Sequence, residues 1–475
     1  MSGSFGSINT ALTALRYQQV ALDVASTNVA NVGTDGYVRR RVVGETLGAG
    51  VTPALWSKTT DTGSGVQASR LDRMTDALLD SRVRREHGRQ SFLDTRSTVL
   101  ARVETGLAEP GDSGVAAALA DFRSSIHDLG NSPGSDAARS QVVSAAATVV
   151  DAIKLQAHHL ADEASDQRAH VLTSVDEVNA VSTELAETNR TIAAARSGGN
   201  DTSNLLDQRD ALALRLSELT GATAKENARG GIDMVFPGPD PQPALVTGAT
   251  AAHLTITGGI ASDGTASGGP VAFTLDPAVD GTTTAVTAAL GGELGATTQL
   301  LDTDLPAYVS GLKGVVDQLA TQVNTAHQAS YDLAGNAGGD FFTFDTATAG
   351  LTDLERLDTL DVAVTASTLA VSSVSSASKD GGRAGALADA ANVNDPYQRL
   401  VNGFGSTVAS AQALAKNQSA MTSQVDSARE QLAGVSLDEE TVNMLAAQRG
   451  YEAAARVMTT IDSVLDTLIN RTGVR

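Results

Sequence analysis

The sequence predicts a mainly α-helical protein that carries small β-rich modules, and three observations indicate this fold class. Apolar residues recur every seven positions at both ends of the 475-residue chain. A run from Ser135 to Ser197 contains neither Pro nor Gly, as a long helix requires. Between residues 222 and 293, by contrast, turn residues interrupt short β-branched runs, which is typical of strands joined by tight turns.

Composition narrows the functional classes. Asp and Glu (55) outnumber Lys and Arg (34), so the formal charge is −21, and such a chain repels nucleic-acid phosphates. The absence of Cys excludes disulfides, thiolate zinc sites and a Cys nucleophile. No apolar run approaches eighteen residues, so we expect no membrane insertion. The first residues lack the basic and apolar regions of a cleaved secretory signal, and we expect none.

The C-terminal helix, expected from about Val435 to Arg475, carries an apolar stripe with coiled-coil spacing. Its positions are Leu437, Met444, Tyr451, Met458 and Leu465, with Ala447, Ala454, Ile461 and Leu468 three residues after the last four. Ser436 and Glu439 have the spacing of a capping box, so we interpret Glu439 as a helix-capping residue. Glu440 adjoins it, but neighbours on a helix are not expected to face one site.

The N-terminal helix has a matching stripe at Ile8, Leu15, Leu22 and Val29, with Phe5 and Leu12 on an adjoining strip. It should end in the segment from Asn28 to Tyr37, whose Asn, Gly and Asp residues favour turns. We expect the two terminal helices to pack together although they are far apart in sequence. Two unrelated amphipathic helices on one globule are the alternative.

Between the ends we expect helices over residues 71–106, 115–129, 135–197, 204–219, 295–330 and 395–433. Extended segments are expected after Tyr37 and from Phe341, and a strand with a Ser-rich loop is expected over residues 358–378. The arginines Arg39, Arg40 and Arg41 are expected to be solvated, and binding of an acidic partner is the alternative. The patterns divide the chain into a terminal unit (1–45 and 432–475), a mainly helical unit (46–221 and 294–431) and a small β-rich module (222–293).

Motifs for catalysis are absent from the sequence. The seven His residues show no zinc spacing, and neither a P-loop nor a G-x-S-x-G nucleophile elbow occurs. The Gly-rich turn from Asp332 to Asp340 lacks the spacing of a calcium-binding EF-hand loop. We therefore expect no catalytic residue, no cofactor and no metal site.

Four stretches, in order along the chain, resemble one family. The first stretch consists of Ala11-Leu12-x-Ala14-Leu15, Ala21-Leu22-Asp23 and Asn28-Val29-Ala30-Asn31-x-x-Thr34-x-Gly36-Tyr37, and it resembles the N-terminal signature of flagellar rod, hook and hook-associated proteins. It departs from that signature at Val29, where the family usually has Ile, and at Asp35, where it often has Pro. The other three are similar to the hook–filament junction members of that family, the first hook-associated proteins: residues 205–210 with Leu216-Ser217, residues 291–342, and residues 434–470.

The resemblance implies a structural subunit without enzymatic activity, which leaves the cell through the flagellar type III export channel. Family members form a ring of identical subunits at the hook tip, and their partners are the hook protein, a second junction protein, filament flagellin and an export chaperone. Their terminal helices form an inner coiled-coil layer, D0, with a D1 domain outside it. A rod or hook subunit, or less readily an exported peptidoglycan hydrolase on an axial scaffold, is the alternative.

The expected location is extracellular, in the flagellum at the hook–filament junction. The residues expected at the assembly interface belong to the two stripes and to the turn after the first helix: Ile8, Leu12, Leu15, Leu22, Asn28, Val29, Asn31, Gly36, Tyr37, Leu437, Met444, Tyr451, Met458, Ile461, Leu465 and Leu468.

Overall fold

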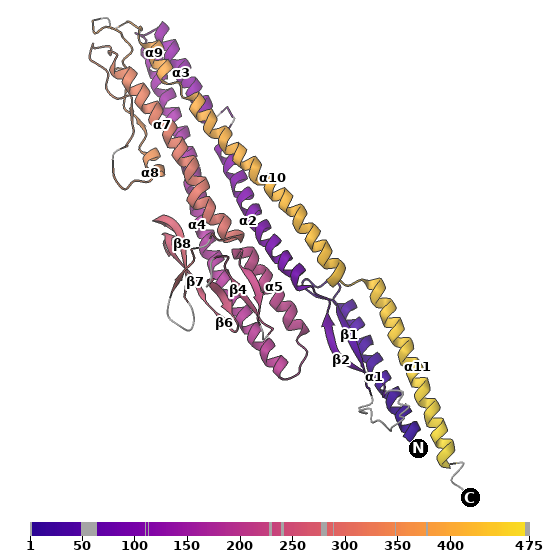
Figure 1. Ribbon diagram of the computed structural model, residues 1–475. Coiled ribbons are helices and arrows are strands. Elements are labelled where there is room, and N and C mark those ends of the chain that lie inside the picture. Colours follow the sequence, from indigo (N-terminus) through magenta and orange to yellow (C-terminus); the bar gives the residue numbers. More distant parts are fainter. Residues whose placement is uncertain are drawn as a thin grey trace.

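The computed structural model describes residues 2–48, 64–109, 111–112, 114–227, 230–238, 242–276, 283–287, 289–346, 348–376 and 379–470. The molecule is elongated and built mainly from long helices, with both termini at one end (Figure 1). The predicted fold class, mainly helical with β modules, is confirmed. None of the helices in these ranges combines the length and apolar character that crossing a membrane requires.

The terminal helices α1 (Ser2–Ala30) and α11 (Leu437–Asn470) lie side by side, as predicted (Figure 1). Small residues face the partner helix and allow close approach, because Ala11, Ala25 and Ala447 are buried. At Gly450 an added Cβ would lie 2.6 Å from Cδ of Gln18, so the Gln18 side chain of α1 packs against the backbone of α11 there. The terminal pair is therefore held by a seam of small and apolar side chains.

The hairpin of β1 (Arg40–Thr46) and β2 (Val66–Arg73) packs on α1. The sequence pattern had placed Leu71 at a helix start, and that prediction is wrong. The helix α2 (Ala77–Leu107) begins after Asp76, whose carboxylate accepts the backbone N–H groups of Leu78 and Leu79. The expected boundary between residues 45 and 46 falls inside β1.

One apolar core fills the half of the body distant from the termini. Its helices are the C-terminal half of α2, α3 (Val115–Asn131), the N-terminal half of α4 (Asp136–Ser197), α7 (Leu305–Gln328), α9 (Ala384–Ala390) and the start of α10 (Asn394–Ala433). Phe122, Phe341 and Phe342 form a mutually contacting aromatic cluster at its centre. Short elements cover its side, namely α8 (Asp353–Asp358), β10 (Phe342–Thr343) and β11 (Asp361–Val362). Within residues 358–378, expected as a strand with a Ser-rich loop, the strand is limited to β11.

A second core joins the remainder of α4 and α5 (Ser203–Thr220) to two antiparallel sheets. Val178 and Leu216 of the helices contact the same cluster as Phe236 and Leu254 of the β-rich segment. The strands of that segment are present as expected, but the expected boundary at 221/222 runs through their shared core. The elements are β3 (Thr223–Glu226), β4 (Ile232–Val235), β5 (Ala244–Thr247), β6 (Thr250–Ala251), β7 (His253–Ile260), β8 (Ala266–Asp276), β9 (Thr284–Ala285), α6 (Gly292–Gln299) and the π-helical η1 (Leu300–Asp304).

Candidate functional site

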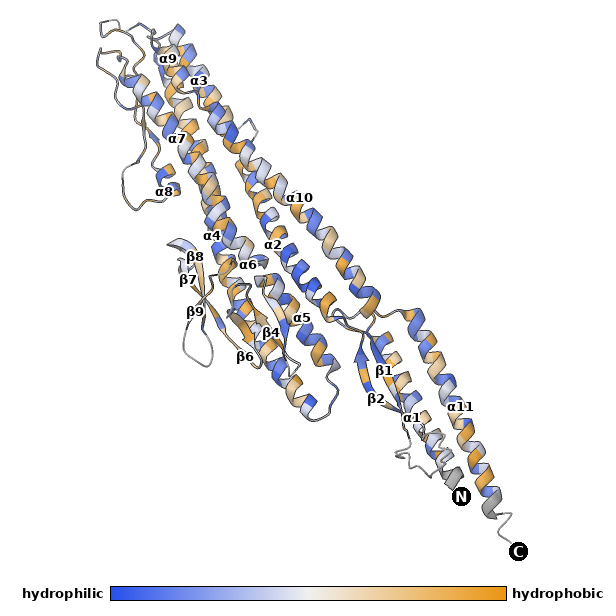
Figure 2. Ribbon diagram, viewed as in Figure 1, coloured by the Kyte–Doolittle hydropathy of each residue, from blue (hydrophilic) through white to orange (hydrophobic). Residues whose placement is uncertain are grey.

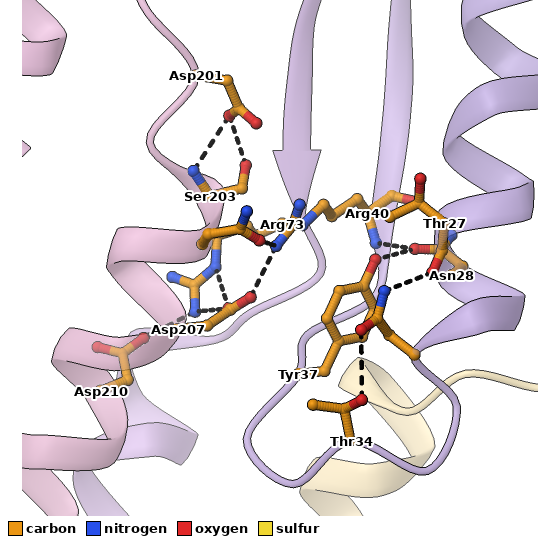
Figure 3. A network of polar contacts seen from close by, with 12 residues as sticks. Thr27, Asn28, Thr34, Tyr37, Arg40, Arg73, Asp201, Ser203, Asp207 and Asp210 are labelled. Atoms are coloured by element: carbon orange, nitrogen blue, oxygen red, sulfur yellow. Dashed lines mark hydrogen bonds and ion pairs between the residues drawn. The ribbon is translucent and has the colours of Figure 1, made fainter.

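A buried polar network joins the terminal pair to the body, and Asn28 lies at its centre (Figure 3). The Asn28 Oδ1 atom accepts hydrogen bonds from the Tyr37 hydroxyl (2.8 Å) and from the Arg40 backbone N–H (3.1 Å). Its Nδ2 atom donates to the Arg40 carbonyl (2.9 Å). The amide thus pairs with both backbone groups of Arg40, as a neighbouring strand would, and fixes the chain reversal between α1 and β1.

The turn that closes this reversal uses two further residues of the family signature. Asn31 donates from Nδ2 to the Thr27 carbonyl (2.8 Å), which terminates α1. Gly36 has φ +77°, a conformation that side-chain-bearing residues rarely adopt. The turn therefore depends on the residue types that the sequence singled out.

The first turn of α11 reaches the same network. Glu440 is 2% exposed, and its carboxylate accepts from Asn28 Nδ2 (3.1 Å) and from Arg39 Nε (2.8 Å). Glu439 accepts from Arg39 Nη1 at 2.6 Å. The expectation that the two carboxylates would not share a site is wrong, because one long guanidinium lies across the helix start and reaches both.

The capping role assigned to Glu439 is also incomplete. Its backbone N–H donates to the Ser436 hydroxyl (3.4 Å), as expected, but its side chain binds Arg39. Glu439 is therefore a contact between the α1–β1 connection and α11. The backbone adds a further contact, because the Arg39 N–H donates to the carbonyl of Ala433 at the end of α10 (2.9 Å).

An ion-pair ladder continues from β1 into α5. Asp207 accepts from Arg40 Nη2 (2.9 Å) and from Arg73 Nη2 (2.6 Å), and Arg73 also reaches Asp210 (2.9 Å). The side chains of Arg40 and Arg73 are only 7% and 9% exposed. Arg40 was expected to be solvated, and that expectation is wrong because its partners lie on α5, far along the chain. Arg41 is exposed, as expected.

Two groups of this ladder, Arg73 and Asp210, are held in their charged forms. Burial lowers the pKa of Arg73, but the neighbouring Asp210 and Asp207 outweigh it and leave that pKa above its usual value. Burial likewise pushes the pKa of Asp210 upward, and Arg209 and Arg73 reverse the shift. Burial raises the pKa of Tyr37, so its hydroxyl keeps the proton that it donates to Asn28. The chemistry of the site is thus permanent ion pairing, suited to fixing one element against another.

The predicted seam residues differ in exposure. Half-buried in the α1–α11 pair are Ile8, Leu15, Leu22, Val29, Met444, Met458, Ile461 and Leu465. More exposed are Leu12 (37%), Leu437 (48%) and Tyr451 (44%). Leu468 and Phe5 lie outside the residues whose side chains the structure describes.

The helix α11 also exposes four aliphatic side chains outside its contact with α1 that the seven-residue spacing did not identify, here called the exposed strip of α11. Val442, Leu445, Val457 and Val464 are 66%, 54%, 51% and 49% exposed. A row of exposed aliphatic side chains on one helix indicates a surface for a protein partner.

Sequence reasoning did not assign six residues of the polar network, although the sequence held two signals. The acidic motif Asp207-Gln208-Arg209-Asp210 and the arginine run after Tyr37 have complementary charges. The six residues are Arg39, Arg40, Arg73, Asp207, Asp210 and Glu440.

Beside this network, His87 of α2 lies between two carboxylates. Its Nδ1 atom is 3.2 Å from Glu218 Oε1 of α5, and its Nε2 atom is 2.9 Å from Asp426 Oδ1 of α10. The bond to Glu218 raises the pKa of His87, burial opposes it, and Asp426 raises it further. The imidazolium therefore links three helices.

We expect a pH-dependent contribution to stability from His87. Because its pKa is higher in the folded chain than in the unfolded one, the stabilisation is complete below about pH 6.5 and is lost as pH rises through the folded pKa. The midpoint of thermal unfolding of His87→Gln should be lower than that of the unsubstituted chain near pH 5.5 and approach it near pH 8.5, an effect of ~1 kcal/mol or less for partly exposed groups. His159→Gln on the exposed side of α4 is the control, and a difference independent of pH would contradict the assignment.

Comparison with known proteins agrees with this architecture. The family model described as Flagellar hook-associated protein FlgK helical domain matches residues 100–342. The model described as Flagella basal body rod protein matches residues 8–37, and that described as Flagellar basal body rod FlgEFG protein C-terminal matches residues 431–471.

Flagellar hook-associated protein 1 of Bacillus subtilis is 28% identical over 517 residues, which cover 100% of this chain and 99% of that relative. The Escherichia coli protein of the same name is 28% identical over 349 residues, covering 70% of this chain and 59% of its own length. Among solved structures, the flagellar hook junction protein FlgK from Burkholderia pseudomallei superposes with a TM-score of 0.64 at 15% identity, covering 75% of this chain and 100% of that one. At that identity the likeness concerns the fold.

Proposed function

The chain belongs to the flagellar hook-associated FlgK family, and we propose that it works as a structural subunit of the hook–filament junction, held there by its terminal helices. The observation that carries this proposal is the terminal pair itself. One face of α11 packs on α1, while Val442, Val457 and Val464 outside that face remain exposed. A single chain leaves this strip uncovered, and assembly would bury it.

In this proposal residues 1–45 with 432–475 form the inner D0 unit, residues 46–221 with 294–431 the D1 unit, and residues 222–293 an outer module. The seam and turn residues named from the sequence, together with the exposed strip of α11, form the assembly interface. Burying each exposed aliphatic side chain would contribute about 1.5–3 kcal/mol. The polar network would fix D0 against D1 and so set the direction in which the terminal pair projects.

The partners we propose are identical subunits in a ring, the hook protein below, and a second junction protein with flagellin above. Export through the flagellar type III channel, with a chaperone, would deliver the subunit to the extracellular end of the hook. We propose no enzymatic step. Within the described ranges, no group of three or more His, Asp or Glu side chains is placed to hold a metal ion.

Deleting residues 437–475 should abolish filament attachment while the truncated chain is still exported. The physical reason is that the deletion removes α11 and with it the cover of α1. The measurement is an immunoblot of culture medium for export, together with electron microscopy of hooks for attached filaments. Filaments that remain attached would contradict the proposal.

A milder variant separates assembly from folding. Val442→Ser, Val457→Ser and Val464→Ser together alter only the exposed strip, so thermal unfolding of the free subunit should change little, whereas attachment should be lost. Matched substitutions at the exposed residues Asp438, Glu452 and Asp462, also to Ser, should leave attachment intact.

A further inference from the structure

A groove of about 600 Å³ runs beside α2, where that helix faces β3 and the start of α6. Its floor is apolar, formed by Phe92, Leu93, Ala222, Ala224 and Pro237. Its rim is formed by Arg84, Arg85 and Arg89 of α2. An apolar floor with a charged rim is the usual design of a surface that receives a protein element.

The rim carries an excess of positive charge. Arg85 and Arg89 share one carboxylate, that of Glu86, at 3.6 and 3.7 Å, and Gln418 also donates to it (2.9 Å). Arg85 and Arg89 are 51% and 61% exposed. Figure 2 shows this part of α2 as a mainly hydrophilic stretch, in contrast to α7. In a chain of net charge −21, such a rim is locally complementary to acidic protein surface.

Arg84 adds a second observation that indicates a ligand. Its Nε atom is buried and lacks a hydrogen-bond partner among the described residues. Burial lowers the pKa of Arg84, while Asp210 and Asp80 oppose that shift only through space. A guanidinium left without a direct partner at the edge of a groove gains by receiving an incoming carboxylate.

The chain also carries an acidic surface, whose charge is opposite to that of the arginine rim of the groove. Five exposed carboxylates follow one face of α4, and at roughly 100° per residue they fall within an arc of about 80°. Small residues, Ala169, Thr173 and Ala180, lie among them and leave the helix surface shallow enough for close approach. The five are Asp162, Asp166, Asp176, Glu184 and Glu187.

We propose that the α2 groove of one subunit receives this acidic face of α4 from the adjacent identical subunit. The inference rests on the proposed function, because a closed ring of identical subunits needs head-to-tail contacts between two different surfaces of the same chain. The groove and the acidic face are two such surfaces. Net charge disfavours a nucleic-acid occupant, since the groove lies within a strongly acidic chain.

A charge-swap experiment tests the contact. Arg85→Glu with Arg89→Glu should reduce incorporation of the subunit into isolated hook–filament junctions by about tenfold or more, and Asp176→Arg with Glu184→Arg should do the same. The chain with all four substitutions should regain incorporation, because the charges again match. Asp176 and Glu184 are exposed, so thermal unfolding of the α4 pair should stay near that of the unsubstituted chain. The groove pair also reverses the two cations beside the buried Glu86, so its unfolding midpoint should be lower, and its incorporation is scored at a temperature where circular dichroism shows the free variant folded.

The absence of Cys permits a direct geometric test. In assembled junctions, Arg89→Cys combined with Glu184→Cys should form disulfide-linked ladders of subunits under oxidation. Arg89→Cys combined with Asp121→Cys, an exposed position on α3, should not.

Each other outcome overturns the inference. Normal incorporation of either charge-reversed pair would show that the contact is not used. Failure of the groove variant alone would assign the groove to a different acidic partner, and failure of the four-substitution chain would exclude pairing of these two surfaces. These outcomes leave the proposed function intact, whereas that function fails if the unsubstituted chain is absent from junctions.

Discussion

Replacing Asp207 by Ala should lower the free energy of unfolding by about 3–5 kcal/mol, because it removes one partner of a buried ion-pair network. Asp207 binds both Arg40 and Arg73, whose side chains are 7% and 9% exposed. After the substitution Arg73 keeps Asp210, but Arg40 loses its carboxylate partner while it stays buried. Arg40 would keep only the neutral Asn204 amide and the Tyr37 ring as partners, and this buried cation without a counter-charge, more than the lost attraction, accounts for the size of the effect.

The change should be local to the connection between the terminal pair and the body. Amide exchange of residues 40–46 and 66–73 should accelerate far more than that of the aromatic core around Phe122. Asp121→Ala, which removes an exposed carboxylate from α3, is the control and should alter stability by less than about 0.5 kcal/mol. Unchanged exchange in the hairpin of the Asp207 variant would show that the ladder does not hold it.

Gly221→Ala should also be strongly destabilising, by about 2–5 kcal/mol in total, in the second core. Gly221 has φ +69°, and an added Cβ would lie 2.5 Å from the Cα atom of Gly291. Left-handed backbone costs about 1–2 kcal/mol for a residue with a side chain. The clash adds about 1–3 kcal/mol, because two backbone segments must move apart.

A second glycine isolates the steric contribution. Gly199 has nearly the same backbone angle, φ +70°, but nothing lies within 4 Å of its hypothetical Cβ. Gly199→Ala should therefore show the conformational cost alone, measured by denaturant unfolding of both variants. Equal destabilisation by the two substitutions would mean that the approach of Gly221 to Gly291 contributes nothing.

The long helices could be predicted from the sequence because their signals are local. The span of α4, Asp136–Ser197, follows from the absence of Pro and Gly, and the seam of α11 follows from its seven-residue spacing. The strand β2 could not be recognised, since its partner β1 lies beyond a long connection and its own residues continue smoothly into the helical pattern of α2. The core shared by α4, α5 and the sheets was not predicted for a similar reason. Periodicity shows which face of a helix is buried, but it does not show which other element packs on that face.

Only the N-terminal residues of the candidate site were predicted from the sequence. Asn28, Gly36 and Tyr37 were singled out by the family signature, and each contributes to the turn or to the network. Their partners were not found because Arg40 and Asp207 are 167 residues apart, and Asn28 and Glu440 are 412 apart. Ion pairs between residues so far apart in sequence produce no periodic pattern in the sequence, so these pairs can be identified only from the three-dimensional structure.

The 412-residue separation of Asn28 and Glu440 has a consequence for the order of events during folding. A chain can form α4 or the aromatic core as soon as those segments are available, since their contacts are comparatively local. The contact between Asn28 and Glu440 closes one of the longest loops in the molecule and requires both terminal helices to be present. The terminal pair, which we propose as the assembly element, is therefore expected to form after the cores of the body, because its two helices come from the first and last segments of the chain.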